Sequence, residues 1–141
     1  MKKQITTGFI TDIKNIASWE EKYKKIIEWG KALEPFPEEF REEKYKVKGC
    51  QSQVWLHAER GAHGIIIFKA DSDAILVKGL ISILINEFSG KTPEEILSTP
   101  VDFVKDAGLD QHLTPSRTNG LFAMIKQIRS YAQAFYLIDK Q

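Results

Sequence analysis

The sequence has one cysteine, almost no net charge and no long apolar run. Its 141 residues include 20 lysines and arginines against 19 aspartates and glutamates, a formal net charge of +1 at pH 7. A single cysteine excludes an internal disulfide and an iron–sulfur cluster held by several thiolates. A nearly neutral chain has no global field that attracts nucleic acid or an anionic membrane, so we expect neither as a partner.

Targeting and membrane signals are also missing. The first residues, MKKQITTGFITD, contain no apolar segment followed by a small-residue cleavage site, as a secretory signal would. The most apolar stretch, AILVKGLISILINEF, is interrupted by Lys78, Ser82 and Asn86 and is too short to span a bilayer. We therefore expect a cytoplasmic protein.

Motifs for cofactors and metals are absent as well. Neither a GxGxxG fingerprint nor a P-loop occurs, so we expect the chain to bind no cofactor of its own. His57, His63 and His112 are not spaced in pairs with Cys50 or with each other, as the ligands of a structural zinc site would be. We expect no metal site.

The composition is that of one soluble globular domain. Hydrophobic residues make up 43% of the chain and charged residues 28%, which is typical of neither disordered nor membrane proteins. A chain of this length can bury a core but is too short to divide into two domains. We expect a single domain over residues 1–141.

Sequence periodicity predicts a small sheet covered by helices. Ser18 and Glu21 form a capping-box pattern, and apolar residues then recur at helical spacing as far as Leu33, before Pro35 and Pro37. Alternating patterns predict strands at 44–48, 53–60 and 65–70, the last two forming a hairpin across GAHG. The expected fold is α+β, a small antiparallel sheet of about three strands packed against several helices.

The remaining helices are predicted from their caps. Asp71, Ser72 and Asp73 are candidate N-caps for an apolar helix that we expect at the centre of the core. Thr92 to Glu95 has the pattern of a second helix start, and Thr99-Pro100 that of a third. Residues 108–120 show no periodicity and read as a loop before a last helix from Leu121 onward.

Cys50 lies in the predicted loop between two strands, which makes it the leading candidate for chemistry. Free cysteine is often a buried packing residue, but loops carry function more often than packing. A thiol reacts as its thiolate, so something must activate or present it. Gly49 permits a tight turn, and Gln51 and Ser52 can donate hydrogen bonds to sulfur. A Cys-His hydrolase with His57 or His112 as base is an alternative, although no protease signature is present.

Several motifs, in order, resemble one family. They are GCQSQVWL around Cys50, ADSDA and VKGL at 70–74 and 77–80, SGKTPEEIL at 89–97, and GLDQHLTPSRTNGL at 108–121 followed by AMIKQIR. This pattern resembles the SufE family of sulfur-acceptor proteins, including its CsdE-like members. Thr114 stands where the family pattern has serine, and both residue types cap helices.

The resemblance implies a role in sulfur transfer. A cysteine desulfurase of the SufS/CsdA-like kind, with its own pyridoxal phosphate (PLP), would hold sulfur as a persulfide. Cys50 would accept that sulfur, stimulate the desulfurase and pass the sulfur to a downstream iron–sulfur scaffold. The chain would then be a relay partner rather than an autonomous enzyme. A solitary cysteine suits this role, because a second thiol nearby could expel the sulfur as sulfide.

The resemblance also marks supporting residues. Gly49, Gln51 and Ser52 are expected to shape the surroundings of the thiol, and Asp73, His112 and Arg117 to support it or to contact the partner. Each has a plainer interpretation: a helix cap for Asp73, packing for His112 and a solvated loop side chain for Arg117. A desulfurase adaptor that needs no thiol is the other alternative, and the sequence leaves open a homodimer.

Overall fold

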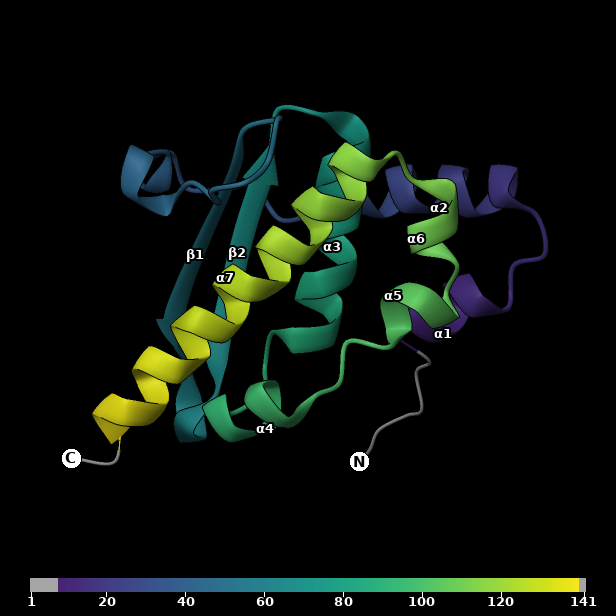
Figure 1. Ribbon diagram of the computed structural model, residues 1–141. Helices are drawn as coiled ribbons and strands as arrows, with labels where there is room; N and C mark the ends of the chain where they lie inside the picture. The colour runs from purple at the N-terminus through teal and green to yellow at the C-terminus, as the bar shows by residue number, and fades with distance from the viewer. Residues whose placement is uncertain (1–7, 140–141) are drawn as a thin grey trace.

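A computed structural model describes residues 8–139 of the protein. The strands are β1 (Val54–Arg60) and β2 (Ile66–Ser72), and short 3-10 turns occur at η1 (Glu38–Phe40), η2 (Glu43–Tyr45) and η3 (Ala62–Gly64). The α-helices are α1 (Phe9–Lys14), α2 (Trp19–Lys31), α3 (Ile75–Phe88), α4 (Pro93–Ser98), α5 (Phe103–Asp106), α6 (Leu109–His112) and α7 (Pro115–Asp139). Figure 1 shows α7 crossing the hairpin, with α3 behind it at the centre.

The apolar helix α3 is the centre of the core, as the sequence predicts. It packs against α2, β2 and α7, so it is covered on several sides. Leu80, Ile81, Leu84 and Phe88 are fully buried. Burying such side chains contributes about 1.5–3 kcal/mol each relative to leaving them exposed. The burial of α3 therefore fixes the hairpin, α2 and α7 relative to one another.

The antiparallel hairpin is confirmed, but the sheet has two strands rather than the three expected. β1 and β2 pair from Val54 with Ser72 to Arg60 with Ile66. The segment expected as a strand at 44–48 instead ends the turn η2 and forms one isolated bridge, from Lys46 to Trp55. Gly49 then turns the chain with a φ of +93°, so the pairing cannot extend into a ladder.

Two predicted helix starts are confirmed by their caps. The Ser18 hydroxyl accepts a hydrogen bond from the Glu21 N–H at 3.2 Å. At α4 both bonds of the capping box form, at 3.2 Å to the Thr92 hydroxyl and at 2.9 Å to the Glu95 carboxylate. These starts depend on local chemistry alone, which explains why the sequence predicts them.

Two other helix starts differ from the predictions. Asp71, Ser72 and Asp73 do not cap α3, because β2 continues through Ser72 and the N-cap is Ala74, with no side-chain cap. The third predicted start, at Thr99-Pro100, is wrong by a few residues, since α5 begins at Phe103.

Residues 108–120 are mostly helical rather than a loop. They contain α6 and the first turns of α7, which begins at Pro115. Thr114 accepts a hydrogen bond from the Arg117 N–H at 3.3 Å, so it does cap a helix. The first turns of α7 are largely exposed and polar, and they therefore lack the apolar period by which helices are recognised.

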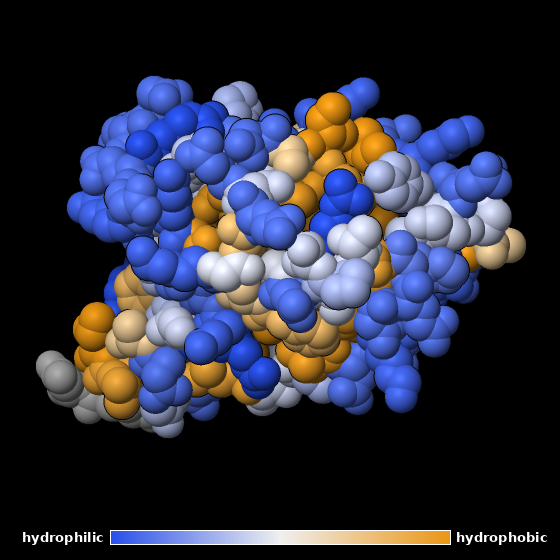
Figure 2. Space-filling model, turned by 45° about the horizontal axis from the view of Figure 1, so that its top comes forward, coloured by the Kyte–Doolittle hydropathy of each residue, from blue (hydrophilic) through white to orange (hydrophobic). Residues whose placement is uncertain are grey.

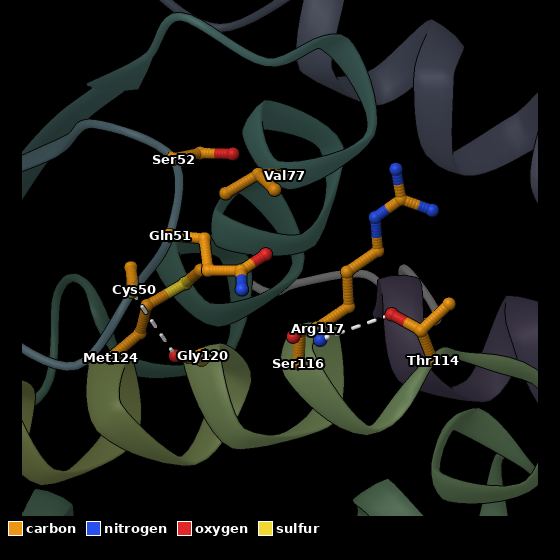
Figure 3. A pocket seen from close by; sticks show the side chains of 9 residues that line it. All are labelled: Cys50, Gln51, Ser52, Val77, Thr114, Ser116, Arg117, Gly120 and Met124. Carbon is orange, nitrogen blue, oxygen red and sulfur yellow. Dashed lines mark hydrogen bonds between the residues drawn. The ribbon is translucent and has the colours of Figure 1, made fainter.

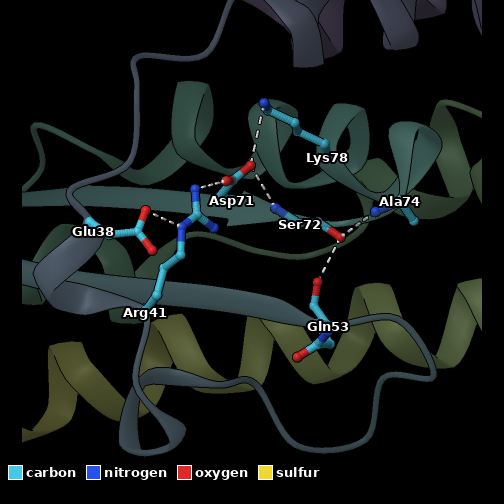
Figure 4. Close-up of polar contacts among 7 residues, drawn as sticks. All are labelled: Glu38, Arg41, Gln53, Asp71, Ser72, Ala74 and Lys78. Carbon is cyan, nitrogen blue, oxygen red and sulfur yellow. Dashed lines mark hydrogen bonds and ion pairs between the residues drawn. The ribbon is translucent and has the colours of Figure 1, made fainter.

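Asp71 joins three separate segments (Figure 4). Its carboxylate accepts hydrogen bonds from the Arg41 guanidinium at 2.5 Å and the Ser72 N–H at 2.8 Å, and it pairs with Lys78 of α3 at 3.3 Å. Burial opposes the charge of Asp71, but the bond from Arg41, supported by Ser72 and Lys78, lowers the pKa of Asp71 below its ordinary value. The segment after α2, the end of β2 and the start of α3 are thus tied together.

Helices α2 and α3 approach each other closely at two glycines. A Cβ atom at Gly79 would lie 2.3 Å from the carbonyl oxygen of Ile26, and one at Gly30 would lie 2.7 Å from the Gly79 nitrogen. Such distances are far inside van der Waals contact, so only glycine fits at this crossing.

None of the helices within residues 8–139 combines the length and the apolar character needed to cross a membrane.

Gly79→Ala should destabilise the protein by about 1–3 kcal/mol, because the added methyl group overpacks the crossing. Urea unfolding would measure this loss. Gly120→Ala in α7 is a matched control, since its Cβ would meet Cys50 Sγ at an ordinary 3.5 Å. Alanine at that position should be neutral or gain up to about 1 kcal/mol from its higher helix propensity. Equal losses for both variants would contradict the close crossing.

Asp71→Asn should lower the free energy of unfolding at pH 7 by about 2–3 kcal/mol, because two cations lose their anion. The depressed pKa of Asp71 stabilises the fold above the pKa of the unfolded chain, and this contribution is lost as pH falls through the folded pKa. The difference from wild type should therefore shrink between neutral and strongly acidic pH. Asp106→Asn is the control, because it removes an exposed ion pair in which Asp106 and Lys14 lie 4.0 Å apart. This substitution should change the free energy of unfolding little at any pH.

Candidate functional site

Cys50 lies in the loop before β1 and faces α7. Its thiol donates a hydrogen bond to the carbonyl oxygen of Gly120, at 3.6 Å, and the residue is half-buried. The backbone at Gly49 also lies close to α7, because a Cβ atom at Gly49 would be only 3.3 Å from the Cβ atom of Ala123. Glycine at 49 therefore serves both the turn and the close approach of the loop to α7.

Both ends of the Cys50 loop are held by hydrogen bonds. Before the cysteine, the Val47 N–H donates to the Val54 carbonyl at 2.8 Å. After it, the Gln53 N–H and side-chain amide donate to the Asp73 carboxylate at 3.0 and 3.3 Å. The Ser72 hydroxyl donates to the Gln53 carbonyl at 2.8 Å. Asp73 thus anchors the loop rather than capping α3.

The thiol opens onto a pocket of about 360 Å³ between the loop, α3 and α7. The pocket lies at the end of the molecule where β1, α3 and α7 begin, at the top of Figure 1, and Figure 2 turns this end forward to show apolar surface between hydrophilic side chains. Figure 3 shows the Gln51 amide reaching across from the loop. The lining residues are Cys50, Gln51, Ser52, Val77, Thr114, Ser116, Arg117, Gly120 and Met124.

A second pocket, of about 270 Å³, is lined by the same loop. The lining residues are Glu43, Lys46, Val47, Lys48, Gly49, Cys50, Gln51, Ser52, Gln53 and Val54. Cys50 therefore belongs to both pockets, and the structure brings the predicted residues Gly49, Gln51, Ser52 and Arg117 around it.

Two histidines that the sequence offers as bases lie elsewhere. His112 is exposed and stacks on Trp19 with ring centroids 4.6 Å apart, and His57 stacks on Phe40 at 3.6 Å. Within residues 8–139 no histidine lines either pocket beside Cys50. The arrangement gives a Cys-His hydrolase no base at the thiol.

Some residues of the site escape sequence reasoning. Val77 and Met124 match the apolar period of their helices, so they read as core residues, and Ser116 falls in the segment taken for a loop. Gly120, at the end of the segment predicted as a loop, lies inside α7, where its carbonyl oxygen accepts the hydrogen bond of the Cys50 thiol. The usable signal for this wall is the motif at 108–121, which contains Thr114, Ser116 and Gly120.

The surroundings of the thiol disfavour its ionised form. Burial raises the pKa of the Cys50 thiol above its ordinary value. At neutral pH the resting protein therefore holds a protonated thiol against a carbonyl. In the described part of the chain, no group of three or more His, Cys, Asp or Glu side chains is placed to hold a metal ion.

Comparison with known proteins agrees with this geometry. In fold, the chain is similar to the solution structure of a hypothetical protein from Thermus thermophilus, with a TM-score of 0.76 and 23% sequence identity over 91% of this chain and 93% of that one. In sequence, residues 7–132 match the family SufE, described as the Fe-S metabolism associated domain. The match covers most of the chain, and the protein therefore belongs to the SufE family and is associated with iron–sulfur metabolism.

Proposed function

We propose that this protein accepts sulfur on Cys50 from a PLP-dependent cysteine desulfurase and relays it to an iron–sulfur scaffold. The observation that carries the proposal is the position of the only thiol in the chain, half-buried between two pockets in a loop anchored at both ends. A carrier needs one accessible sulfur and no second thiol beside it. Membership of the SufE family supports the link to iron–sulfur metabolism.

The proposed step is a sulfur transfer with balanced atoms and electrons. The Cys50 thiolate attacks the terminal sulfur of the desulfurase persulfide, and a new sulfur–sulfur bond forms as the old one breaks. The electron pair of the broken bond leaves with the donor cysteine, which becomes a thiolate. No external oxidant or reductant is needed. Pyridoxal phosphate acts only in the desulfurase, so this chain is a relay and not an autonomous enzyme.

Removal of sulfur from the donor explains how the relay would stimulate its partner. Each transfer returns the desulfurase cysteine to the state that accepts the next sulfur. The side chain of Gln51 reaches into the pocket beside Cys50 and can donate a hydrogen bond to the persulfide anion (Figure 3). Ser52, on the same wall, can donate in the same way.

Cys50→Ser should abolish sulfur acceptance and leave the fold intact, because serine keeps the size of the side chain and removes the nucleophile. Intact-protein mass spectrometry after incubation with a desulfurase and L-cysteine measures the gain of sulfur. The wild type should gain one or more sulfur atoms that a reductant removes, and the variant none.

The same variant separates the relay from a thiol-independent adaptor. An adaptor would stimulate the desulfurase equally well as wild type and as Cys50→Ser, so equal stimulation by the two proteins would overturn the relay. Circular dichroism of the variant controls for loss of structure.

Alkylation of the resting protein should report the protected thiol. Because burial raises the pKa of Cys50, the thiolate fraction and the rate with iodoacetamide should rise with pH to a midpoint above that of the chain unfolded in urea, about 8.5. The chain has one cysteine, so the label reports this site alone. A native midpoint at or below the unfolded one would show that the fold activates the thiol at rest.

A further inference from the structure

Each of the two pockets that share Cys50 has an unpaired cation in its lining. Lys48 precedes the cysteine by two residues and lines the second pocket. Arg117, in the first turn of α7, lines the first pocket. Both residues are exposed, and Cys50 is shared by the two pockets.

The charges of Lys48 and Arg117 are not neutralised. Within residues 8–139, neither side chain forms an ion pair or a hydrogen bond. Nearby lysines do: Lys46 pairs with Glu43 at 3.3 Å, and Lys44 with Glu42 at 3.8 Å.

One carboxylate, Glu43, is among the lining residues of the two pockets. Glu43, which lines the second pocket, is the partner of Lys46, and Asp73 accepts two hydrogen bonds from Gln53. Asp73 keeps its negative charge, because Gln53 is neutral, but it lines neither pocket. The lining of the two pockets carries the cations Lys46, Lys48 and Arg117 against the single carboxylate Glu43. The rim around Cys50 is therefore locally positive in a chain whose overall charge is close to zero.

The two cations do not serve to ionise the thiol. Burial raises the pKa of Cys50 in spite of these two cations. Because both side chains are exposed, their field extends into solvent, where it acts on an approaching molecule. Unpaired surface charges of this kind speed the encounter with an oppositely charged partner and do so less as salt increases.

We propose that Lys48 and Arg117 form a cationic rim that docks an acidic surface of the sulfur donor around Cys50. The inference rests on the proposed function and adds the chemistry of the partner: carboxylates on both sides of the cysteine that carries the persulfide. Lys48 is the residue that this inference newly assigns, as a positioning residue that does not touch the reacting sulfur atoms.

The first test needs no partner protein. Dithiobis(nitrobenzoate) is a dianionic disulfide and dithiodipyridine a neutral one, and the Cys50 thiolate attacks either, releasing one thiolate of the reagent. We take the rate with the dianionic reagent divided by the rate with the neutral reagent. The exposure and the ionisation of the thiol affect both rates equally, so this ratio reports the local electrostatic field. For the wild type the ratio should fall as salt is added, since salt screens the rim.

Lys48→Glu should lower this ratio at low salt by about three- to tenfold, because a repulsive charge replaces an attractive one. Lys44→Glu is the matched control: it makes the same change four residues earlier, at a lysine that lines neither pocket. Its ratio should stay close to that of wild type. A ratio that responds to neither salt nor Lys48→Glu would overturn the cationic rim.

The second test uses a purified SufS/CsdA-like desulfurase loaded with pyridoxal phosphate. Stopped-flow association should be slower for Lys48→Glu and for Arg117→Glu than for Lys44→Glu, and the difference should vanish at high salt. Equal association rates at low salt would overturn the docking inference even if sulfur is still transferred. A rate ratio that responds as expected, combined with no sulfur transfer, would instead keep the rim and refute the proposed function.

Discussion

The burial of α3 is the constraint on which the rest of the structure depends. This helix is apolar on most of its surface, so it must be covered by several elements at once, and α2, β2 and α7 cover it. The hairpin and α7 consequently cannot move independently. Their fixed positions bring the loop before β1 against the Gly120 turn of α7, where the thiol meets a backbone carbonyl. The site is a consequence of core packing, although its residues lie at the surface.

The sequence predicts those features that local chemistry determines. The caps at Ser18 and Thr92 and the alternation in the hairpin need only neighbouring residues, and they are confirmed. Two of the predictions that failed, at 44–48 and at Asp71, concern segments whose structure depends on contacts with other parts of the fold. The alternation of lysine and apolar residues at 44–48 is typical of a strand, but a strand forms only where a neighbouring strand pairs with it over several residues. Asp71 has the sequence position of a helix cap, but its carboxylate accepts a hydrogen bond from Arg41, thirty residues earlier.

The candidate site shows the same division. Cys50 is recognisable from the sequence because it is the only cysteine and lies between two predicted strands. Gln51, Ser52 and Arg117, which the family resemblance marks as supporting residues, line the same pocket. His112 belongs to the same motif but stacks on Trp19 instead. Proximity in a motif does not reveal which way a helix turns its side chains, and that orientation is set by packing of α6 and α7.

The placement of charge suits a thiol that must wait before it reacts. A cation in contact with the sulfur would lower its pKa and expose the resting protein to any oxidant or electrophile. Positive groups at the rim leave the thiol protonated and still favour an anionic partner at longer range. In the proposed relay, selectivity would thus come from the encounter, while reactivity would appear only when the partner displaces the thiol from the Gly120 carbonyl.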